Sequence, residues 1–167
     1  MNKALLAAFS GLIIAGFVAC NKDQRDPCLQ PRFSVLRVHC VRHYDTSAAL
    51  IDTALPAPLL FPITNQAQKY VFGGTGRVIY FSLQLSNLAD STSWILQPDS
   101  LSSVRDTLSF FYQKQLHFLS NACGYSYFYH VDSVRSTKNA IDSLRLEATD
   151  VTNDASVEHL KIIFKYH

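Results

Sequence analysis

Residues 77–85 read RVIYFSLQL, and their side chains alternate in character from one position to the next. The odd-numbered positions from Ile79 to Leu85 are all large and apolar, whereas Ser82 and Gln84 between them are polar. A period of two is typical of a β-strand that turns one face toward a hydrophobic core. The stretch therefore predicts a half-buried strand.

The same period recurs along the rest of the chain, with few competing helical patterns. Further strands are predicted at residues 33–44, 106–112, 116–119, 125–131, 141–149 and 159–166, with the polar residues 113–115 as a hairpin connection. Short strands separated by regularly spaced turns are typical of sandwiches and small barrels. We therefore expect an all-β fold, a single antiparallel β-sandwich of the immunoglobulin-like kind, with a small β-barrel as the alternative.

Two irregular stretches interrupt this pattern. Gly73-Gly74-Thr75-Gly76 is predicted to form a glycine hairpin, since no helix follows that could receive a phosphate as in a P-loop. Residues 55–63 are apolar but contain three prolines, which cannot donate to a sheet ladder. This stretch is predicted to be an edge strand or a crossing segment.

The amino terminus has the features of an export signal. Lys3 is followed by an uncharged apolar run from Ala4 to Ala19, which is too short for a comfortable membrane span. Phe17-Val18-Ala19-Cys20 resembles a bacterial lipobox, with Phe where Leu is commoner. Residues 1–19 are therefore predicted to be a helical lipoprotein signal peptide, and Cys20 to carry acyl chains such as palmitate. Ordinary signal cleavage with a plain Cys20 thiol is the alternative.

The predicted domain organisation follows from this export signal. Residues 20–30 would be the lipidated cysteine and a polar tether, and residues 31–167 one β-sandwich domain. Asn21 stands where some bacteria place an inner-membrane retention Asp, which favours an exported protein anchored at the outer membrane. The sequence leaves open whether the domain faces the periplasm or the cell surface.

The charge balance argues against a nucleic-acid partner. The chain has 15 basic and 13 acidic residues, a net charge of +2. Nucleic-acid binders usually concentrate basic residues on one face. With 11 Phe, 8 Tyr and 1 Trp the chain can instead form a substantial core, which argues against disorder.

Three cysteines remain for an oxidising compartment if Cys20 is lipidated. Any two of Cys28, Cys40 and Cys123 could pair. The strand period places Cys40 on the core face, where it would pack as a buried free thiol. A disulfide between Cys28 and Cys123 is therefore favoured.

No catalytic or metal-binding motif stands out. His39 and His43 share a strand face but lie about 13 Å apart at about 3.3 Å per residue, too far for one metal ion. There is no Gly-x-Ser-x-Gly, His-Glu-x-x-His or Cys-x-x-Cys motif. The acids are dispersed, although a pair of carboxylates from distant strands stays open. We expect no enzyme activity, no metal and no cofactor.

One aromatic stripe could be a binding surface. Tyr125, Tyr127 and Tyr129 alternate along one predicted strand, and Trp94 is the only tryptophan. Tyrosine and tryptophan suit protein interfaces and stacking on sugars. The alternative is that these rings are half-buried sandwich packing.

Several motifs in order give a family resemblance. They are the lipobox Cys20, a second cysteine soon after it (Cys28), and the segments DTLSF (106–110), FLSNACGY (118–125) and EHLKIIF (158–164). In these the chain resembles a group of small, uncharacterised Bacteroidetes lipoproteins, domain of unknown function 6452. The resemblance implies no activity.

These observations lead to two expectations of function. The first is a non-enzymatic structural or protein-interaction module, anchored in the cell envelope and contacting another envelope protein. The second is a glycan- or peptidoglycan-binding lipoprotein that uses the tyrosine and tryptophan face.

Overall fold

The computed structural model describes residues 27–44, 48–63, 72–73 and 76–165. The predicted signal peptide, Cys20 and the tether up to residue 26 lie outside the described residues. Within the described ranges every regular element is a strand. The strands are β1 (Leu36–His43), β2 (Leu50–Asp52), β3 (Leu59–Pro62), β4 (Phe72–Gly73), β5 (Tyr80–Leu83), β6 (Ser91–Gln97), β7 (Asp106–Ser120), β8 (Gly124–Ser136), β9 (Ile141–Leu146), β10 (Asp150–Val151) and β11 (Leu160–Phe164).

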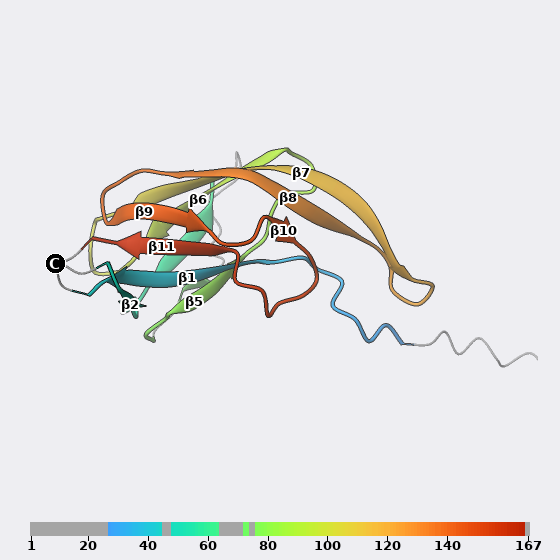
Figure 1. The fold of residues 1–167 in the computed structure, drawn as a ribbon, viewed down its shortest axis with the longest axis horizontal. Helices are drawn as coiled ribbons and strands as arrows, with labels where there is room; N and C mark the ends of the chain where they lie inside the picture. Colours follow the sequence, from blue (N-terminus) through green and yellow to red (C-terminus); the bar gives the residue numbers. More distant parts are fainter. Residues whose placement is uncertain (1–26, 45–47, 64–71, 74–75, 166–167) are drawn as a thin grey trace, which may run out of the picture.

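The strands form two sheets that stack as the two layers of a β-sandwich (Figure 1). The larger sheet has the order β10-β8-β7-β6-β3-β4. The smaller sheet has the order β2-β1-β11-β9. Two strands pair with the other edge of β1, β5 with its residues 36–39 and β2 with its residues 41–43. Neither sheet closes on itself in the described part of the chain. The prediction of an all-β sandwich is confirmed, and the barrel alternative is not the fold.

The core lies between the two layers and uses the apolar faces that the period of two predicted. The smaller sheet contributes Leu36 and Val38 of β1 and Leu160 and Ile162 of β11, all fully buried. The larger sheet contributes, among others, Leu108, Phe110 and Tyr112 of β7. Alternating apolar residues on the two inner faces interdigitate in this way in sandwiches generally.

Cys40 belongs to this core and is a free thiol, as the sequence predicted. Its side chain has no exposed surface. Burial disfavours the charged thiolate and raises the pKa of Cys40 to about 12. At neutral pH the group is therefore a protonated thiol that packs as a small apolar side chain.

One strand pair departs from a purely antiparallel sandwich. β1 and β11 run parallel, with Val38 opposite Leu160. After β10 the chain returns to the end of the sheet at which β1 begins. There the backbone N–H of His159 donates to the Arg37 carbonyl at 3.0 Å, so β11 starts beside β1 and runs in the same direction.

The prediction for the glycine stretch falls partly outside the described residues, which do not include residues 74–75. The strands on either side of it do not pair with each other, since β4 pairs with β3 in the larger sheet and β5 with β1 in the smaller one. The proline-rich stretch takes the second of its two predicted forms, a crossing segment, because it leads from β2 in the smaller sheet to β3 in the larger one. It does not form an edge strand, because β3 is paired with β6 on one side and β4 on the other. β4 reaches only Leu59 and Leu60, so Pro62 lies where β3 has one partner and needs no second donor.

The prediction of a hairpin connection at residues 113–115 is wrong, because β7 continues through these residues to Ser120. The strand turns only at residues 121–123, and β8 starts at Gly124, whose φ of 74° is a conformation that favours glycine. The triplet is polar because both of its faces are exposed, not because the chain turns there.

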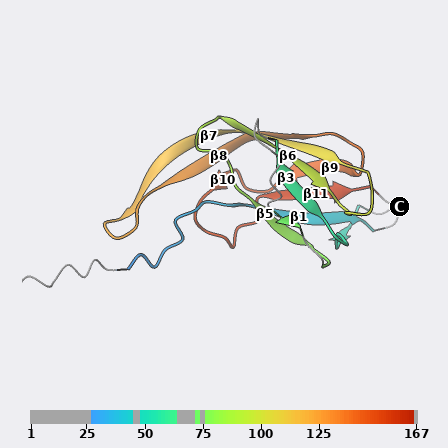
Figure 2. The same ribbon diagram turned by 180° about the vertical axis from the view of Figure 1, so that it is seen from behind.

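β7 and β8 are longer than the other strands of the larger sheet and extend past them. β6 pairs with β7 only as far as Phe111, and β10 pairs with β8 only at Tyr129 and His130. Beyond these partners the two strands form a two-stranded ribbon, residues 115–128, which we call the arm. Figures 1 and 2 show the arm extending past the other strands, at the end opposite to that at which β11 ends.

A buried carboxylate fixes the crossing from the larger to the smaller sheet. Asp106, 1% exposed, accepts hydrogen bonds from the Thr137 hydroxyl and from the backbone N–H groups of Asn139, Ala140 and Ile141, at 2.7–3.0 Å. These donors would otherwise lack partners where the chain leaves β8 and enters β9. Residues 137–140 thus form a link between the two layers.

Candidate functional site

The structure divides the residues of the predicted aromatic face. Trp94 and Tyr129 are 4% and 7% exposed, so placing them on an exposed face is wrong. Tyr129 packs edge-on against Tyr112, with ring centroids 5.3 Å apart, and donates its hydroxyl to the Leu85 carbonyl. Tyr127 is half-buried against the core, and Tyr125 is 64% exposed.

The reason is that the stripe runs along β8 from the body onto the arm. Tyr129 lies where the smaller sheet and its connections cover the inner face. Tyr125 lies near the tip, opposite Phe118 of β7. One alternating pattern therefore contains both a core residue and a surface residue.

The structure contains the predicted disulfide between Cys28 and Cys123, with a Cα–Cα distance of 4.8 Å. It joins the segment before β1 to the turn at the tip of the arm, across a sequence separation of 95 residues. The Arg32 guanidinium donates to the Ala122 carbonyl at 3.3 Å and adds a second contact to this turn. The tip of the arm is thus fastened to the amino-terminal segment.

Side chains extend this attachment along the edge of β8. The Ser126 hydroxyl donates to the Arg32 carbonyl, and the Ser34 hydroxyl donates to the Tyr127 carbonyl, both at 2.7 Å. Asn153 donates to the Pro31 carbonyl from the other side. Residues 31–34 therefore follow the arm without forming a regular ladder with it.

A cleft of about 300 Å³ opens between this segment, the chain after β5 and the inner face of β8. We call it the arm cleft. It is lined by Arg32, Phe33, Ser34, Gln84, Leu85, Asn87, Tyr125, Ser126, Tyr127 and Tyr129. Its lining combines aromatic rings with amide, hydroxyl and guanidinium groups and contains no carboxylate. Such a lining can stack on a ring and hydrogen-bond to hydroxyls, but it offers no carboxylate for acid–base catalysis.

A second cleft, of about 570 Å³, lies at the base of the arm and contains a histidine–carboxylate pair. His130 Nδ1 lies 2.6 Å from Asp150 Oδ1, and both side chains are at least half exposed. A catalytic dyad also needs a nucleophile within hydrogen-bond reach of the base. Among the described residues the histidine has Asp150 as its partner, and no hydroxyl or thiol is bonded to it. The pair is a hydrogen-bonded contact at the surface.

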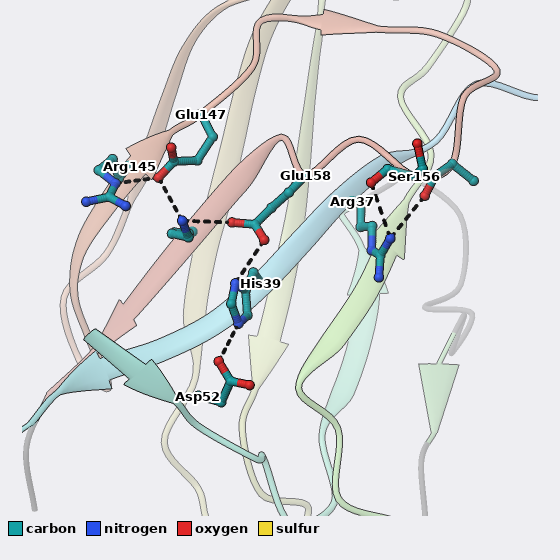
Figure 3. A network of polar contacts seen from close by, with 9 residues as sticks. Arg37, His39, Asp52, Arg145, Glu147, Ser156 and Glu158 are labelled. Carbon is teal, nitrogen blue, oxygen red and sulfur yellow. Dashed lines mark hydrogen bonds and ion pairs between the residues drawn. The ribbon is translucent and has the colours of Figure 1, made fainter. Parts of the chain in front are cut away.

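The outer side of the smaller sheet carries the densest polar network of the described residues. Register places Tyr80, His39, Lys161 and Arg145 side by side across β5, β1, β11 and β9. With their partners they form what we call the charged face, shown in part in Figure 3. The charged face consists of Arg37, His39, Asp52, Tyr80, Arg145, Glu147, Glu158 and Lys161.

His39 occupies the middle of this face and is only 8% exposed. Its Nε2 lies 2.9 Å from Asp52 Oδ1, and its Nδ1 lies 3.0 Å from Glu158 Oε2 (Figure 3). Its ring stacks on Tyr80 with centroids 4.3 Å apart. His39 lies on the face of β1 opposite the core, yet it is buried because these neighbours cover it.

Lys161 joins two carboxylates that the sequence placed apart. Its Nζ lies 3.1 Å from Glu158 and 3.3 Å from Glu147, which also contacts Arg145. The hydrogen bond from Arg145, followed by that from Lys161, lowers the pKa of Glu147. The contacts with Glu158 and Glu147 raise the pKa of Lys161. At neutral pH each group is therefore charged and paired, which suits a fixed surface better than proton transfer.

Sequence reasoning missed the charged face because its members come from five separate strands and two loops. Asp52 and Glu158 lie 13 and 119 positions from His39. Only the register of β1 with β11 and of β11 with β9 brings the row together. The one signal of this face in the sequence was that His39 lies on the side of its predicted strand opposite the core face.

The described residues contain neither a candidate metal-binding cluster nor a helix that could cross a membrane. No group of three or more His, Cys, Asp or Glu side chains there could hold a metal ion. No helix there has the length and hydropathy that crossing a membrane would require.

Comparison with known proteins adds the family. No curated protein and no solved structure matches the chain significantly. The model of the Family of unknown function (DUF6452) matches residues 63–164, which include β4 to β11 and therefore the whole arm. With this match over more than half of its length, the chain belongs to the Family of unknown function (DUF6452).

Proposed function

We propose that the protein is a non-enzymatic module, anchored at the outer membrane of the cell envelope through acylated Cys20, whose charged face binds another envelope protein. The observation that supports this most is the row of paired side chains across the smaller sheet. Arg37 lies over the Tyr80 ring at 4.7 Å, and His39 stacks beneath the same tyrosine.

The composition and rigidity of this face favour a protein partner. Tyr and Arg are enriched in protein interfaces and carry much of their binding energy. Tyr80 is 42% exposed and is held in place by both neighbours. Side chains that are already fixed lose less entropy when a partner binds. The ion pairs around them would set orientation rather than affinity.

The test is a pull-down of the full-length protein from gently solubilised native membranes, with mass spectrometry of the bound proteins and of the Cys20 peptide. We compare the unmodified chain with Tyr80→Ala and with Tyr125→Ala, an exposed tyrosine outside the charged face. We expect Tyr80→Ala to lower partner recovery about tenfold, the equivalent of about 1.4 kcal/mol. Tyr125→Ala should recover the partner fully.

Three outcomes of this pull-down would contradict the proposal. An acylated protein that comes down alone has no stable envelope partner. Equal recovery with Tyr80→Ala and Tyr125→Ala would place the partner elsewhere. A Cys20 peptide without acyl chains would remove the anchor.

The arm cleft supports a second candidate, a glycan or peptidoglycan ligand. Tyr125, Tyr127 and Phe33 offer ring faces, and Gln84, Asn87 and Arg32 offer hydrogen-bonding groups around the same space. Aromatic faces beside such polar groups suit a sugar ring. Binding of soluble peptidoglycan fragments, measured calorimetrically, tests it. We expect Tyr125→Ala to abolish binding and Tyr80→Ala to leave it unchanged, the reverse of the result for the protein partner.

A further inference from the structure

The inner face of the larger sheet continues onto the arm, where no second layer covers it. On β7 the core positions Phe110 and Tyr112 are followed on the same face by Leu116 and Phe118. Leu116 is 54% and Phe118 49% exposed, and the opposing Tyr125 is 64% exposed. The tip of the arm therefore presents an aliphatic side chain and two aromatic rings to its surroundings.

The amino-terminal segment adds to this apolar surface. Leu29 and Phe33 are 89% and 72% exposed, and they lie on the segment that the disulfide fastens to the tip. Scattered exposed apolar residues are ordinary, but a concentration of them at one end of a molecule marks a contact surface.

The charge of this end is one-sided. Residues 113–131 contain Lys114, His117 and His130 and no acid, and residues 27–35 contain Arg32 and no acid. Lys114 and His130 pair with Asp90 and Asp150 at the base of the arm, which leaves the distal part with no carboxylate of its own. Aromatic and basic side chains together are typical of protein surfaces that lie in the headgroup region of anionic membranes.

The distance between the tip of the arm and the predicted lipid anchor indicates what the tip contacts. Cys28 lies eight positions after Cys20, and such a length of chain spans at most about 28 Å. Cys28 is bonded to Cys123 in the turn of the arm. An acylated Cys20 would therefore keep the tip within about 28 Å of the bilayer surface. The end of the sandwich opposite the arm (Figure 2) would be free to point away from the membrane.

We propose that the tip of the arm lies on the phospholipid surface, with Leu116, Phe118 and Tyr125 in the interfacial layer. This inference rests on the proposed acylation of Cys20. The lipid chains supply the attachment, and the arm and its disulfide set the orientation of the sandwich on the membrane. A tether alone would leave that orientation free, because a short polar linker does not fix rotation.

Fluorescence quenching in vesicles tests the contact. The full-length acylated protein is reconstituted into vesicles of phosphatidylethanolamine and phosphatidylglycerol, with or without brominated acyl chains. One variant is Phe118→Trp, at the tip. The matched control is Leu101→Trp, because Leu101 is 94% exposed and precedes β7 at the opposite end of the sandwich. Both variants retain the buried Trp94 as a common background.

We expect brominated lipid to quench the Phe118→Trp emission substantially and to leave the Leu101→Trp emission unchanged. Quenching of neither probe in a protein whose Cys20 peptide is acylated overturns the membrane contact and leaves the anchor intact. Equal quenching of both shows that the whole domain lies on the surface and also overturns the proposal. If the emission of the tryptophan at position 118 shifts with the number of protein molecules per vesicle and not with bromination, the tip contacts a second copy of the chain instead of the membrane. A Cys20 peptide without acyl chains, in protein that does not remain with vesicles, locates the failure in the anchor instead.

Discussion

The body and the arm of this molecule share strands β7 and β8, yet the two regions are stabilised in different ways. In the body, residues 106–112 of β7 alternate between buried and partly exposed positions because the smaller sheet covers their inner face. In the arm, residues 115–118 of the same strand are exposed on both faces. The comparison teaches that an alternating pattern specifies a strand, whereas burial depends on whether a second layer is present.

This difference predicts where stability resides. A two-stranded ribbon is marginally stable by itself in water. The arm therefore depends on the Cys28–Cys123 disulfide and on the side-chain contacts with residues 31–34. The body depends on a packed core, to which the arm contributes little.

The largest expected effect compares two phenylalanines on the same face of β7. Phe110 is fully buried, and Phe118 is 49% exposed. Phe110→Ala should lower the free energy of unfolding by about 3–5 kcal/mol, since it removes a core ring and leaves a cavity. Phe118→Ala should lower it by less than about 1 kcal/mol. Chemical denaturation of both variants measures the difference, and similar losses would show that the arm is part of the cooperative core.

The next effect removes the attachment of the arm. Cys28→Ser combined with Cys123→Ser should lower the free energy of unfolding by about 2–4 kcal/mol, because the unfolded chain regains the freedom of a long loop. Hydrogen exchange should accelerate most in the arm and least in β1 and β11. Exchange that increases uniformly across the molecule would mean that the arm does not open separately from the body.

A smaller effect concerns pH and the point where the body meets the base of the arm. The fully buried His159 accepts a hydrogen bond at Nδ1 from the Arg37 backbone N–H (3.0 Å), and its Nε2 lies 3.2 Å from the Asp150 carbonyl. This geometry requires the neutral ring with its proton on Nε2. Burial is the main cause that lowers the pKa of His159 below its ordinary value of 6.5.

The sign of the pH dependence follows from that lowered pKa. Above pH 6.5 both the folded and the unfolded states hold the ring neutral, so the ring makes no pH-dependent contribution. As the pH falls below 6.5 the unfolded state takes up the proton first, and the folded state loses stability until the pH passes the lowered folded pKa. Denaturation between pH 7 and pH 5 should show a steeper loss for the unmodified chain than for His159→Asn. Equal slopes would contradict the assignment.

Much of the fold could be predicted from local pattern. The residues of β1 that face the core, from Leu36 to Cys40, follow from alternation alone, and the phase of that strand was enough to set Cys40 apart from the disulfide. The candidate sites were much less predictable. Tyr129 and Tyr125 belong to one stripe, but only the position of the second layer makes the first a core residue and the second a surface residue.

Long-range pairing explains what the sequence could not indicate. The polar residues Gln113–Gln115 look like a turn, because polarity at both faces of a strand and polarity in a loop are the same in sequence. The row from Tyr80 to Arg145 depends on the register of β5, β1, β11 and β9, which no local spacing specifies.

The sequence by itself determined that the chain forms strands, which face of the predicted strands is apolar, and which cysteine is confined to the core. It could do so because side-chain alternation is a property of neighbouring residues. The tertiary structure alone decided that β1 and β11 run parallel, that β7 and β8 extend beyond their partners as an arm, and that the charged face forms on the smaller sheet. Those features come from pairing between distant segments, and their energies depend on what each strand face meets rather than on the residues that compose it.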